Sequence, residues 1–204
     1  MATPPYRIES ARLVLRCYEP RDAPLLADAV NSSLDHLAPW MPWAAPTTVE
    51  DEVQLLRRFR SQFDRDENYV YGVFTPDETR IVGGGGLHPR SDPGSLEIGY
   101  WIAGDVLRRG YATEVAAVLT RVAFDRGGLD RVDIQVDQKN ERSQGIPRKL
   151  GFTHEGTLRR RLERRAGEQR GDSMMFTMLR EEYERAPWRE SYPYRAYDVL
   201  GRGL

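Results

Sequence analysis

The chain has 204 residues, 40% of them hydrophobic, which is enough for one sizeable core. Thirty Lys and Arg residues nearly balance thirty-one Asp and Glu residues, so the formal net charge of −1 gives no overall attraction to nucleic acid or to an anionic membrane. No apolar stretch resembles a signal peptide or a membrane span, and we therefore expect a soluble protein with no membrane partner.

The first predicted elements are a strand over 12–18 and a helix that follows Asp22, the residue expected to cap it. Cys17 lies in the strand, where the alternating pattern favours a half-buried thiol over a nucleophile. It is the only cysteine of the chain, so it cannot form an internal disulfide. This cysteine usage fits a reducing compartment, and we expect a cytoplasmic protein.

An aromatic loop and a second helix are predicted next. The stretch LAPWMPWAAP contains three prolines, which exclude regular structure, and it presents Trp40 and Trp43. Thr48 and Asp51 then form a variant of the capping box, with Asp in the place of Glu or Gln. The apolar spacing that follows predicts a helix ending near Arg65.

Three consecutive runs alternate with the period of a strand, YVYGVFT, RIVGGGGLH and LEIGYWI, and the turn residues between them predict an antiparallel meander. The glycines at 83–86 lack the Lys-Ser/Thr pair and the helix of a phosphate-binding loop, so we interpret them as a strand that lets a large group pass close by. His88, one of three histidines, is a better candidate for a turn or a substrate pocket than for a metal ligand, and no metal is expected.

The second half of the chain predicts a helix ending at Gly127-Gly128, a strand over 131–137 and, after a short helical segment, two strands joined by a long hairpin connection. The order strand, helix, strand implies a parallel crossover. The last 18 residues have no clear period. We therefore expect a single domain over 1–186 and a C-terminal tail over 187–204.

The junction before the long helix, DVLRRGYATEV, is the most concentrated candidate for ligand binding. A helix N-terminus exposes unpaired N–H groups and the positive end of the helix dipole, which together suit a phosphate. Arg108 and Arg109 add positive charge, and Gly110 allows a ligand to come close. An Arg-Gly pair before a helix also occurs as a solvated turn, and on these residues alone both interpretations stay open.

Several motifs, in the right order, resemble the GNAT superfamily of acetyl-CoA-dependent N-acetyltransferases, in particular its RimJ/RimL ribosomal-protein acetyltransferase type. SARLVLR is similar to the family's opening strand, LEIGYWI to its central strand, and RRGYATEV to its pyrophosphate loop and helix. Asn140 and Ser143 match an N-x-x-S motif, and a Leu-Gly-Phe motif follows. The resemblance extends over roughly residues 8–182. It departs from the family at Leu107, where Arg or Gln is usual, and at Arg108, where glycine is common.

This resemblance implies a mixed α/β fold with a central, mostly antiparallel sheet flanked by helices. One parallel strand pair, LEIGYWI and RVDIQVD, is expected to splay apart and admit the pantetheine arm of acetyl-CoA, the co-substrate. Backbone amides of the loop would bind the pyrophosphate, and a backbone N–H near Ile102 would polarise the thioester carbonyl. The residues that the resemblance assigns to cofactor binding are Ile102, Arg108, Arg109, Gly110, Tyr111, Ala112, Thr113 and Asn140.

The implied reaction requires a base, because an amine attacks a thioester only when neutral and an alkylammonium has a pKa of about 10. Glu97 is the candidate, since it shares one strand face with Gly99 and Trp101; without the resemblance it would be an ordinary polar partner. Ser143 is the candidate proton donor to the leaving thiolate. The alternative is that Asn140 or Ser143 caps the following helix.

Trp40 and Trp43 are expected to serve as a lid or as core packing rather than as a specific recognition motif. Matching loops in the family often border the acceptor site, so these two residues, together with the substrate-pocket candidate His88, are the candidates for acceptor selection. The acceptor, a protein N-terminal α-amine or a small-molecule amine, is left open, as is a homodimer. The arginine-rich stretch 158–165 includes Glu163 and is predicted to be a solvated face, so no nucleic-acid partner is expected.

A second function stays open, a non-catalytic acyl-CoA-binding or protein-interaction module with the same fold. Leu107 departs from the family's loop, and Pro147 falls inside a predicted helix and removes a backbone donor. Both changes favour this alternative. Glu97 and Ser143 are both present, which favours an enzyme that transfers acetyl from acetyl-CoA to a primary amine by direct attack in a ternary complex.

Overall fold

The structure is a computed structural model in which residues 4–90, 94–163 and 168–204 are described. Within those ranges the chain forms a nine-stranded sheet, six α-helices and three short 3-10 turns. The strands are β1 Arg7–Glu9, β2 Val14–Cys17, β3 Tyr69–Phe74, β4 Ile81–Pro89, β5 Ser95–Ile102, β6 Arg131–Asp137, β7 Thr153–Leu162, β8 Gly171–Leu179 and β9 Arg195–Tyr197. The helices are α1 Ala23–Asn31, α2 Leu34–Leu37, α3 Val49–Asp64, α4 Tyr111–Gly127, α5 Glu141–Lys149 and α6 Arg180–Glu184, and the 3-10 turns are Pro20–Asp22, Gly104–Val106 and Arg189–Ser191.

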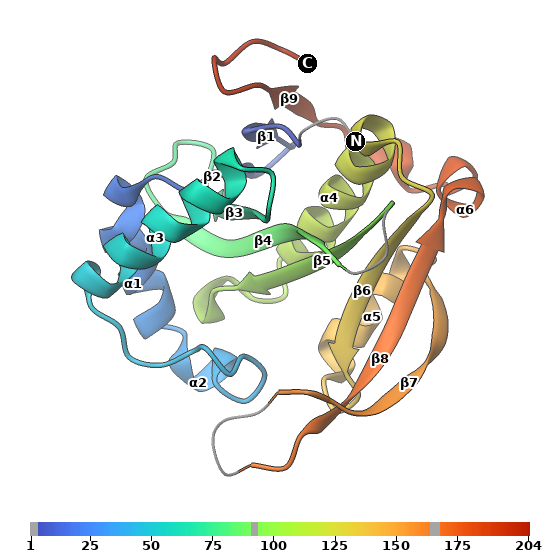
Figure 1. The fold of residues 1–204 in the computed structure, drawn as a ribbon, viewed down its shortest axis with the longest axis horizontal. Coiled ribbons are helices and arrows are strands. Elements are labelled where there is room, and N and C mark those ends of the chain that lie inside the picture. Colours follow the sequence, from blue (N-terminus) through green and yellow to red (C-terminus); the bar gives the residue numbers. More distant parts are fainter. Residues whose placement is uncertain (1–3, 91–93, 164–167) are drawn as a thin grey trace.

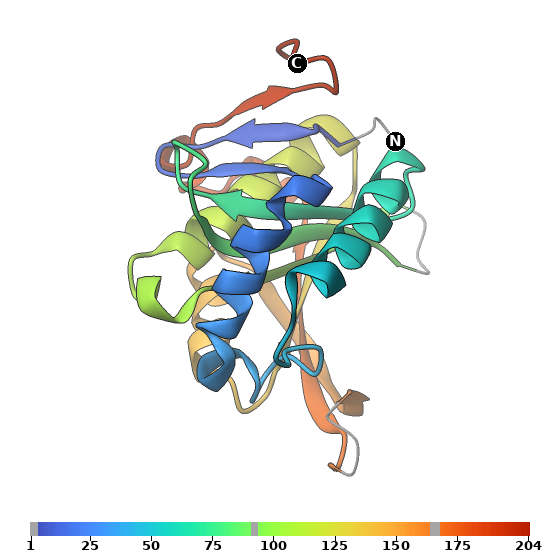
Figure 2. The same cartoon turned by 90° about the vertical axis from the view of Figure 1, so that its left-hand side faces the viewer.

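The strand order across the sheet is β7-β8-β6-β5-β4-β3-β2-β1-β9, and neighbouring strands are antiparallel except for β5 and β6. Helices α1 and α3 lie on one face of the sheet, and α4 and α5 lie on the other (Figures 1 and 2). The connection from β5 through α4 to β6 makes the parallel pair, as a helical crossover allows. The predicted mixed α/β fold, its meander and its parallel pair are confirmed.

The parallel pair opens shortly after it begins. β5 and β6 are in register only over Ser95–Glu97, whereas β6 stays paired with β8 along its length. Figure 1 shows the two ribbons diverging beyond that point. Ala103 N–H donates to Val82 O of β4 at 2.9 Å. Because backbone N–H groups alternate between the two edges of a strand, the N–H groups of Tyr100 and Ile102 point to the opposite edge, toward β6. The divergence therefore exposes backbone donors of β5 to the space between the strands.

Two apolar clusters hold the centre of the sheet between layers of helices. The larger one packs α4 against the sheet and includes Val115 and Leu119. The smaller one packs α1 and α3 through Leu26 and Leu56, and Trp101 of β5 contacts it. Burying a side chain of this size contributes about 1.5–3 kcal/mol. β4 and β5 are thus supported on both faces, which makes them a rigid base for a site.

The four consecutive glycines of β4 make room for neighbours on both faces. A Cβ added at Gly84 would collide with the ring of Trp101, and one added at Gly86 would lie 2.5 Å from Cε1 of His88. On the opposite face, a Cβ at Gly85 would lie 3.0 Å from a side chain of α4. The prediction that this glycine run forms a strand approached closely by a large group is confirmed. The groups that approach it are the rings of Trp101 and His88 and the helix α4.

Substituting Gly83 by alanine is expected to destabilise the protein by about 1–3 kcal/mol, because the added methyl group would collide with the backbone oxygen of Trp101, which cannot rotate away. Gly145→Ala is the matched control. Gly145 lies inside α5 with open space around its Cβ position, so alanine there should stabilise by about 0.5–1 kcal/mol. Urea unfolding measures both; equal free energies of unfolding in the two variants would contradict the close packing of β4 on β5.

β1 and β9 are strands that the sequence pattern does not predict. β1 pairs with β2 on one side and with β9 on the other, where Arg7 faces Tyr197 and Glu9 faces Arg195. Figure 1 shows the two strands together at this edge of the sheet. Each has three residues, too few for an alternation to be recognised.

The predicted helix starts are found, although one cap works differently. In the capping box of α3, Thr48 Oγ1 accepts from Asp51 N at 3.1 Å and the Asp51 carboxylate accepts from Thr48 N at 3.3 Å. Asp22 precedes α1 as predicted, but its carboxylate accepts two hydrogen bonds from Arg16, at 2.7 and 2.8 Å, and does not cap the helix. A bidentate, charge-assisted pair is stronger than a cap, which explains the difference.

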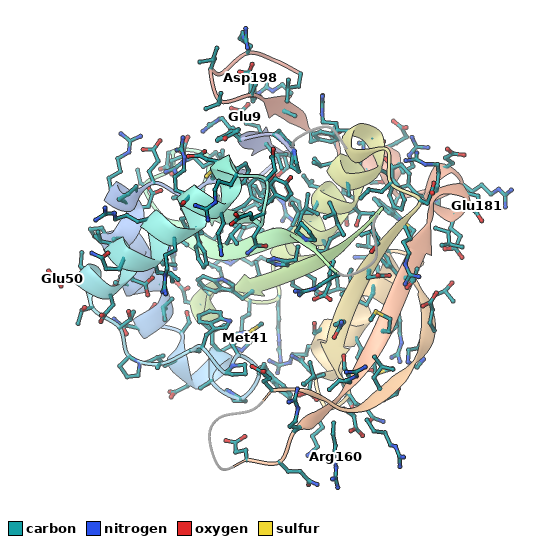
Figure 3. All side chains as sticks on the ribbon, viewed as in Figure 1. Glu9, Met41, Glu50, Arg160, Glu181 and Asp198 are labelled. Atoms are coloured by element: carbon teal, nitrogen blue, oxygen red, sulfur yellow. The ribbon has the colours of Figure 1, made fainter. Side chains whose placement is uncertain are left out.

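Some predicted segments lie outside the described residues, namely 91–93 in the turn before β5 and 164–167 in the hairpin connection. The described part of the arginine-rich stretch lies mainly in β7 and is exposed, and Arg160 points away from the body of the protein (Figure 3). No helix of the described residues is long and apolar enough to cross a membrane.

Candidate functional site

A cavity of about 880 Å³ lies where β5 and β6 diverge, bordered by α1, α3 and the segment between α2 and α3. Met41 on that segment lines it, and Figure 3 shows this residue on the side of the segment that faces β5 and β6. The start of α5 closes the cavity on the β6 side. The aromatic residues that line it are Tyr18, Trp40, Trp43, Phe59, Tyr100 and Trp101.

The predicted site residues fall into two groups. Six of them, from four separate segments, line the cavity: Trp40, Trp43, His88, Glu97, Asn140 and Ser143. The others lie at the end of β5 and the start of α4: Ile102, Arg108, Arg109, Gly110, Tyr111, Ala112 and Thr113. The fold therefore gathers the residues expected for chemistry and acceptor selection, and it adds a helix N-terminus as a second part of the site.

Glu97 is held firmly at the edge of the cavity. Arg90 donates to its carboxylate from Nε at 3.1 Å and from Nη2 at 2.8 Å, and Gln135 Nε2 donates at 2.9 Å. Gln135 in turn accepts a hydrogen bond from Ser173 Oγ at 3.0 Å. The Glu97 side chain is 12% exposed. Its carboxylate is therefore fixed in orientation at the last residue before β5 and β6 separate.

Ser143 and Tyr100 bring two hydroxyl groups together on the α5 side of the cavity. Asn140 Oδ1 accepts from Ser143 N at 3.1 Å, so Asn140 caps α5, while Ser143 Oγ lies 3.3 Å from the Tyr100 hydroxyl. That hydroxyl also lies 3.5 Å from Ser143 O, which lacks the usual helical bond from residue 147 because Pro147 has no N–H. Burial raises the pKa of Tyr100 to about 12, so its hydroxyl keeps its proton at neutral pH.

His88 lines the cavity with its ring in one tautomer. Its Nδ1 lies 2.6 Å from Asn68 Oδ1, and because an amide oxygen only accepts, Nδ1 carries the proton and Nε2 is the acceptor. Burial, together with the charge of Arg90, lowers the pKa of His88 to about 4, so the ring is uncharged at neutral pH. In the described parts of the chain, no group of three or more His, Cys, Asp and Glu side chains could hold a metal ion.

The N-terminus of α4 is left uncapped by side chains. Gly110 is its N-cap, with φ at 79°, and no side-chain cap is present; Arg108 also has a left-handed backbone, with φ at 61°. Arg12 supports the loop, because its Nη1 donates to Arg109 O at 2.8 Å and its Nη2 pairs with the buried Glu114 at 2.6 Å. The N–H groups of the first turn thus remain available for an anion.

Sequence reasoning missed the groups that orient the predicted side chains, namely Tyr100, Arg90, Gln135, Asn68 and Arg12. A signal existed for Gln135, a polar residue in the alternating strand RVDIQVD that runs parallel to the strand of Glu97. Asn68 and Arg90 lie in turns outside any motif, and their contacts depend on tertiary packing. No local pattern could have identified them.

Comparison with known proteins relates this geometry to one family. A family model described as an acetyltransferase (GNAT) domain matches residues 12–153. The chain is 26% identical over 160 residues to the ribosomal protein uS5 alanine N-acetyltransferase of Escherichia coli (strain K12), an alignment that covers 75% of this chain and 81% of that protein.

Solved structures share the fold. RimJ of Mycobacterium smegmatis, solved with a CoA disulfide, superposes with a TM-score of 0.80 at 23% identity, over 89% of this chain and 91% of that one. RimL, a ribosomal L7/L12 α-N-protein acetyltransferase solved with coenzyme A, gives a TM-score of 0.75 at 20% identity, over 89% of this chain and 99% of that one. At these identities the similarity is one of fold.

Proposed function

We propose that this chain, which belongs to the GNAT acetyltransferase family and is an acetyl-CoA-dependent N-acetyltransferase, acetylates a primary amine. The amine enters the cavity beside Glu97. The observation that carries this proposal is the pairing of two features around the divergence of β5 and β6. An uncapped helix N-terminus suits the phosphates, and a cavity with an anchored carboxylate suits the amine.

The loop before α4 fits the phosphate groups of acetyl-CoA, which supplies the activated acetyl group when bound. The proposed contacts are the backbone N–H groups over 109–113, with Gly110 leaving open the space that a side chain would occupy. Leu107 and Arg108 differ from the family's usual loop, but a cradle built from backbone amides does not depend on those side chains. The CoA bound in the RimJ and RimL structures supports the same cofactor here.

The proposed chemistry uses one carboxylate and one hydroxyl. Glu97 accepts the proton of the attacking amine, directly or through water, while Nε2 of the neutral His88 accepts a hydrogen bond from the same amine. The amine attacks the thioester carbonyl directly, so a C–N bond forms and the C–S bond breaks. Ser143 donates a proton or hydrogen bond to the leaving thiolate, with the Tyr100 hydroxyl as its hydrogen-bond neighbour. The amide near Ile102 stabilises the negative charge on the carbonyl oxygen.

The acceptor is a protein N-terminal α-amine or a small-molecule amine. The name of the Escherichia coli relative, an acetyltransferase of ribosomal protein uS5, supports the protein N-terminus. Trp40 and Trp43 border the entrance for either acceptor. We assign the enzyme to the cytoplasm, where the buried free thiol of Cys17 stays reduced.

Acceptor-dependent release of thiol from acetyl-CoA tests the proposed function. The purified chain is assayed with short peptides that have free N-termini and with small primary amines, and we expect thiol release that rises with acceptor concentration. Binding of acetyl-CoA without transfer to any acceptor would favour the non-catalytic acyl-CoA-binding module. Absence of acetyl-CoA binding would contradict the proposal as a whole.

A further inference from the structure

The cavity contains a buried carboxylate that the proposed chemistry does not use. Glu52, in the first part of α3, lines the cavity and is only 5% exposed. Within the described residues, its Oε2 is a buried oxygen with no hydrogen-bond partner. Leaving such a group unsatisfied costs about 1–3 kcal/mol, and more when it is charged. The position therefore suits a ligand group that donates hydrogen bonds or carries positive charge.

The charged side chains around the cavity also favour a cationic ligand. Among the described residues, the carboxylates that line it are Asp51, Glu52, Glu97 and Asp137, and the guanidinium groups are Arg58 and Arg90. Within that set, four carboxylates against two guanidinium groups leave an excess of two negative charges, and His88 is neutral. Arg90 is already paired with Glu97 at 2.8 Å. A cationic ligand would balance this excess, whereas an anionic one would add to it.

Burial raises the pKa of Glu52, a hydrogen bond with the Thr47 side chain opposes that shift, and the nearby charge of Asp51 reinforces it. A bound cation would favour the charged carboxylate. The cavity that Glu52 lines also holds aromatic rings: Phe59 lies on the same helix, and Trp43 stands edge-on to Trp101 with ring centroids 5.8 Å apart. Aromatic faces attract ammonium and guanidinium groups.

Glu52 and Glu97 lie on different walls of the same cavity, one on α3 and the other on β5. We propose that the acceptor carries a second positively charged group besides the amine that is acetylated, and that Glu52 binds this group against the aromatic wall. The proposal rests on the proposed function, because it names the class of acceptor. Two sources share this chemistry, a small diamine and a peptide N-terminus with a basic residue close behind it.

The test compares acceptors that differ only in the second charge. Cadaverine and pentylamine form one pair, and peptides that begin Ala-Lys or Ala-norleucine form the other, so the two arms distinguish the sources. The wild type should use the dicationic member of at least one pair about tenfold more efficiently in kcat/KM. Glu52→Gln should bring that ratio close to one by lowering kcat/KM for the dicationic member of the pair.

Glu50→Gln is the matched control, because Glu50 lies in the same turn of α3 but is exposed and points away from the protein (Figure 3). It should keep the wild-type preference. A wild type that uses both members of each pair equally, or a Glu52→Gln variant that keeps the preference, would overturn the proposal. The comparison of acceptors with the wild-type enzyme tests the preference for a second positive charge even if the Glu52→Gln variant fails to fold.

Titration calorimetry separates this proposal from the proposed function. Cadaverine and pentylamine are titrated into the protein with coenzyme A present, so that no transfer is needed for the readout. If no amine is acetylated, the proposed function fails, and a tenfold tighter binding of cadaverine that Glu52→Gln abolishes would still support the cation site. Equal binding of the two amines would contradict that site whether or not transfer occurs.

Discussion

Replacing Gly110 with aspartate is expected to weaken acetyl-CoA binding by about a hundredfold, which corresponds to about 2.8 kcal/mol. The new carboxylate would lie at the uncapped N-terminus of α4, where the phosphates are proposed to bind, and like charges brought together in an interface cost several kcal/mol. The backbone should tolerate the change, because aspartate adopts the left-handed conformation more readily than most residues and the nearest atom to the new Cβ is Arg12 Nη2 at 3.5 Å. Titration calorimetry with acetyl-CoA measures the loss.

Two control variants separate the effect of the new charge at residue 110 from the effect of losing the glycine backbone and from the effect of adding a charge elsewhere on α4. Gly110→Asn has the same shape without the charge, and its affinity should fall by less than about tenfold. Gly128→Asp adds the same charge at the other end of α4, where the glycine also has a left-handed backbone and open space around it, and it should leave binding unchanged. Wild-type affinity in a folded Gly110→Asp protein would show that the phosphates bind elsewhere.

Glu97→Gln is expected to lower kcat by about 10²–10⁴-fold, the contribution typical of a general base, while acetyl-CoA affinity stays near the wild-type value. Glutamine keeps the size of the side chain and an oxygen that can accept from Arg90, but it cannot take up a proton. Steady-state kinetics measures the loss of kcat, and titration calorimetry with acetyl-CoA measures the affinity.

Glu181→Gln provides the matched control, because Glu181 is an exposed carboxylate of α6, far from the cavity (Figure 3). It should leave kcat unchanged. If Glu97→Gln retains full kcat, Glu97 is an ordinary polar partner of Arg90 and Gln135. If it loses stability and cofactor binding together, its role is structural.

The elements that could be predicted from the sequence are those whose own residues determine their conformation. The capping box at Thr48, the left-handed Gly128 after α4 and the alternation in RVDIQVD are local signals, and the structure agrees with each of them. β1 and β9 escaped prediction because each has only three residues and is defined by the strand beside it. Asp22 was correctly predicted to precede α1, but the predicted capping bond was wrong, because Arg16 of β2 binds the Asp22 carboxylate instead.

The residues of the candidate site also fall into those that a sequence motif identifies and those that only the folded structure identifies. Glu97, Ser143 and Gly110 stand in recognisable motifs, so the resemblance to a family could identify them. Asn68 sets the tautomer of His88 from a turn 20 residues away, and no periodicity or motif marks that contact. Glu52 reads as one of three acidic residues in the first turn of a helix, and only the folded protein distinguishes it as buried.

The pairing of β1 with β9 also affects how the protein folds during synthesis. Residues 7–9 lie against residues 195–197, so the outer edge of β1 lacks this partner until residues 195–197 have been translated. At roughly 5–20 residues per second, that edge stays open for on the order of ten to forty seconds. An unpaired strand edge is a template for association with other chains. Loss of the last ten residues would make this transient exposure permanent, so truncated chains should aggregate even though the cavity and the loop before α4 remain intact.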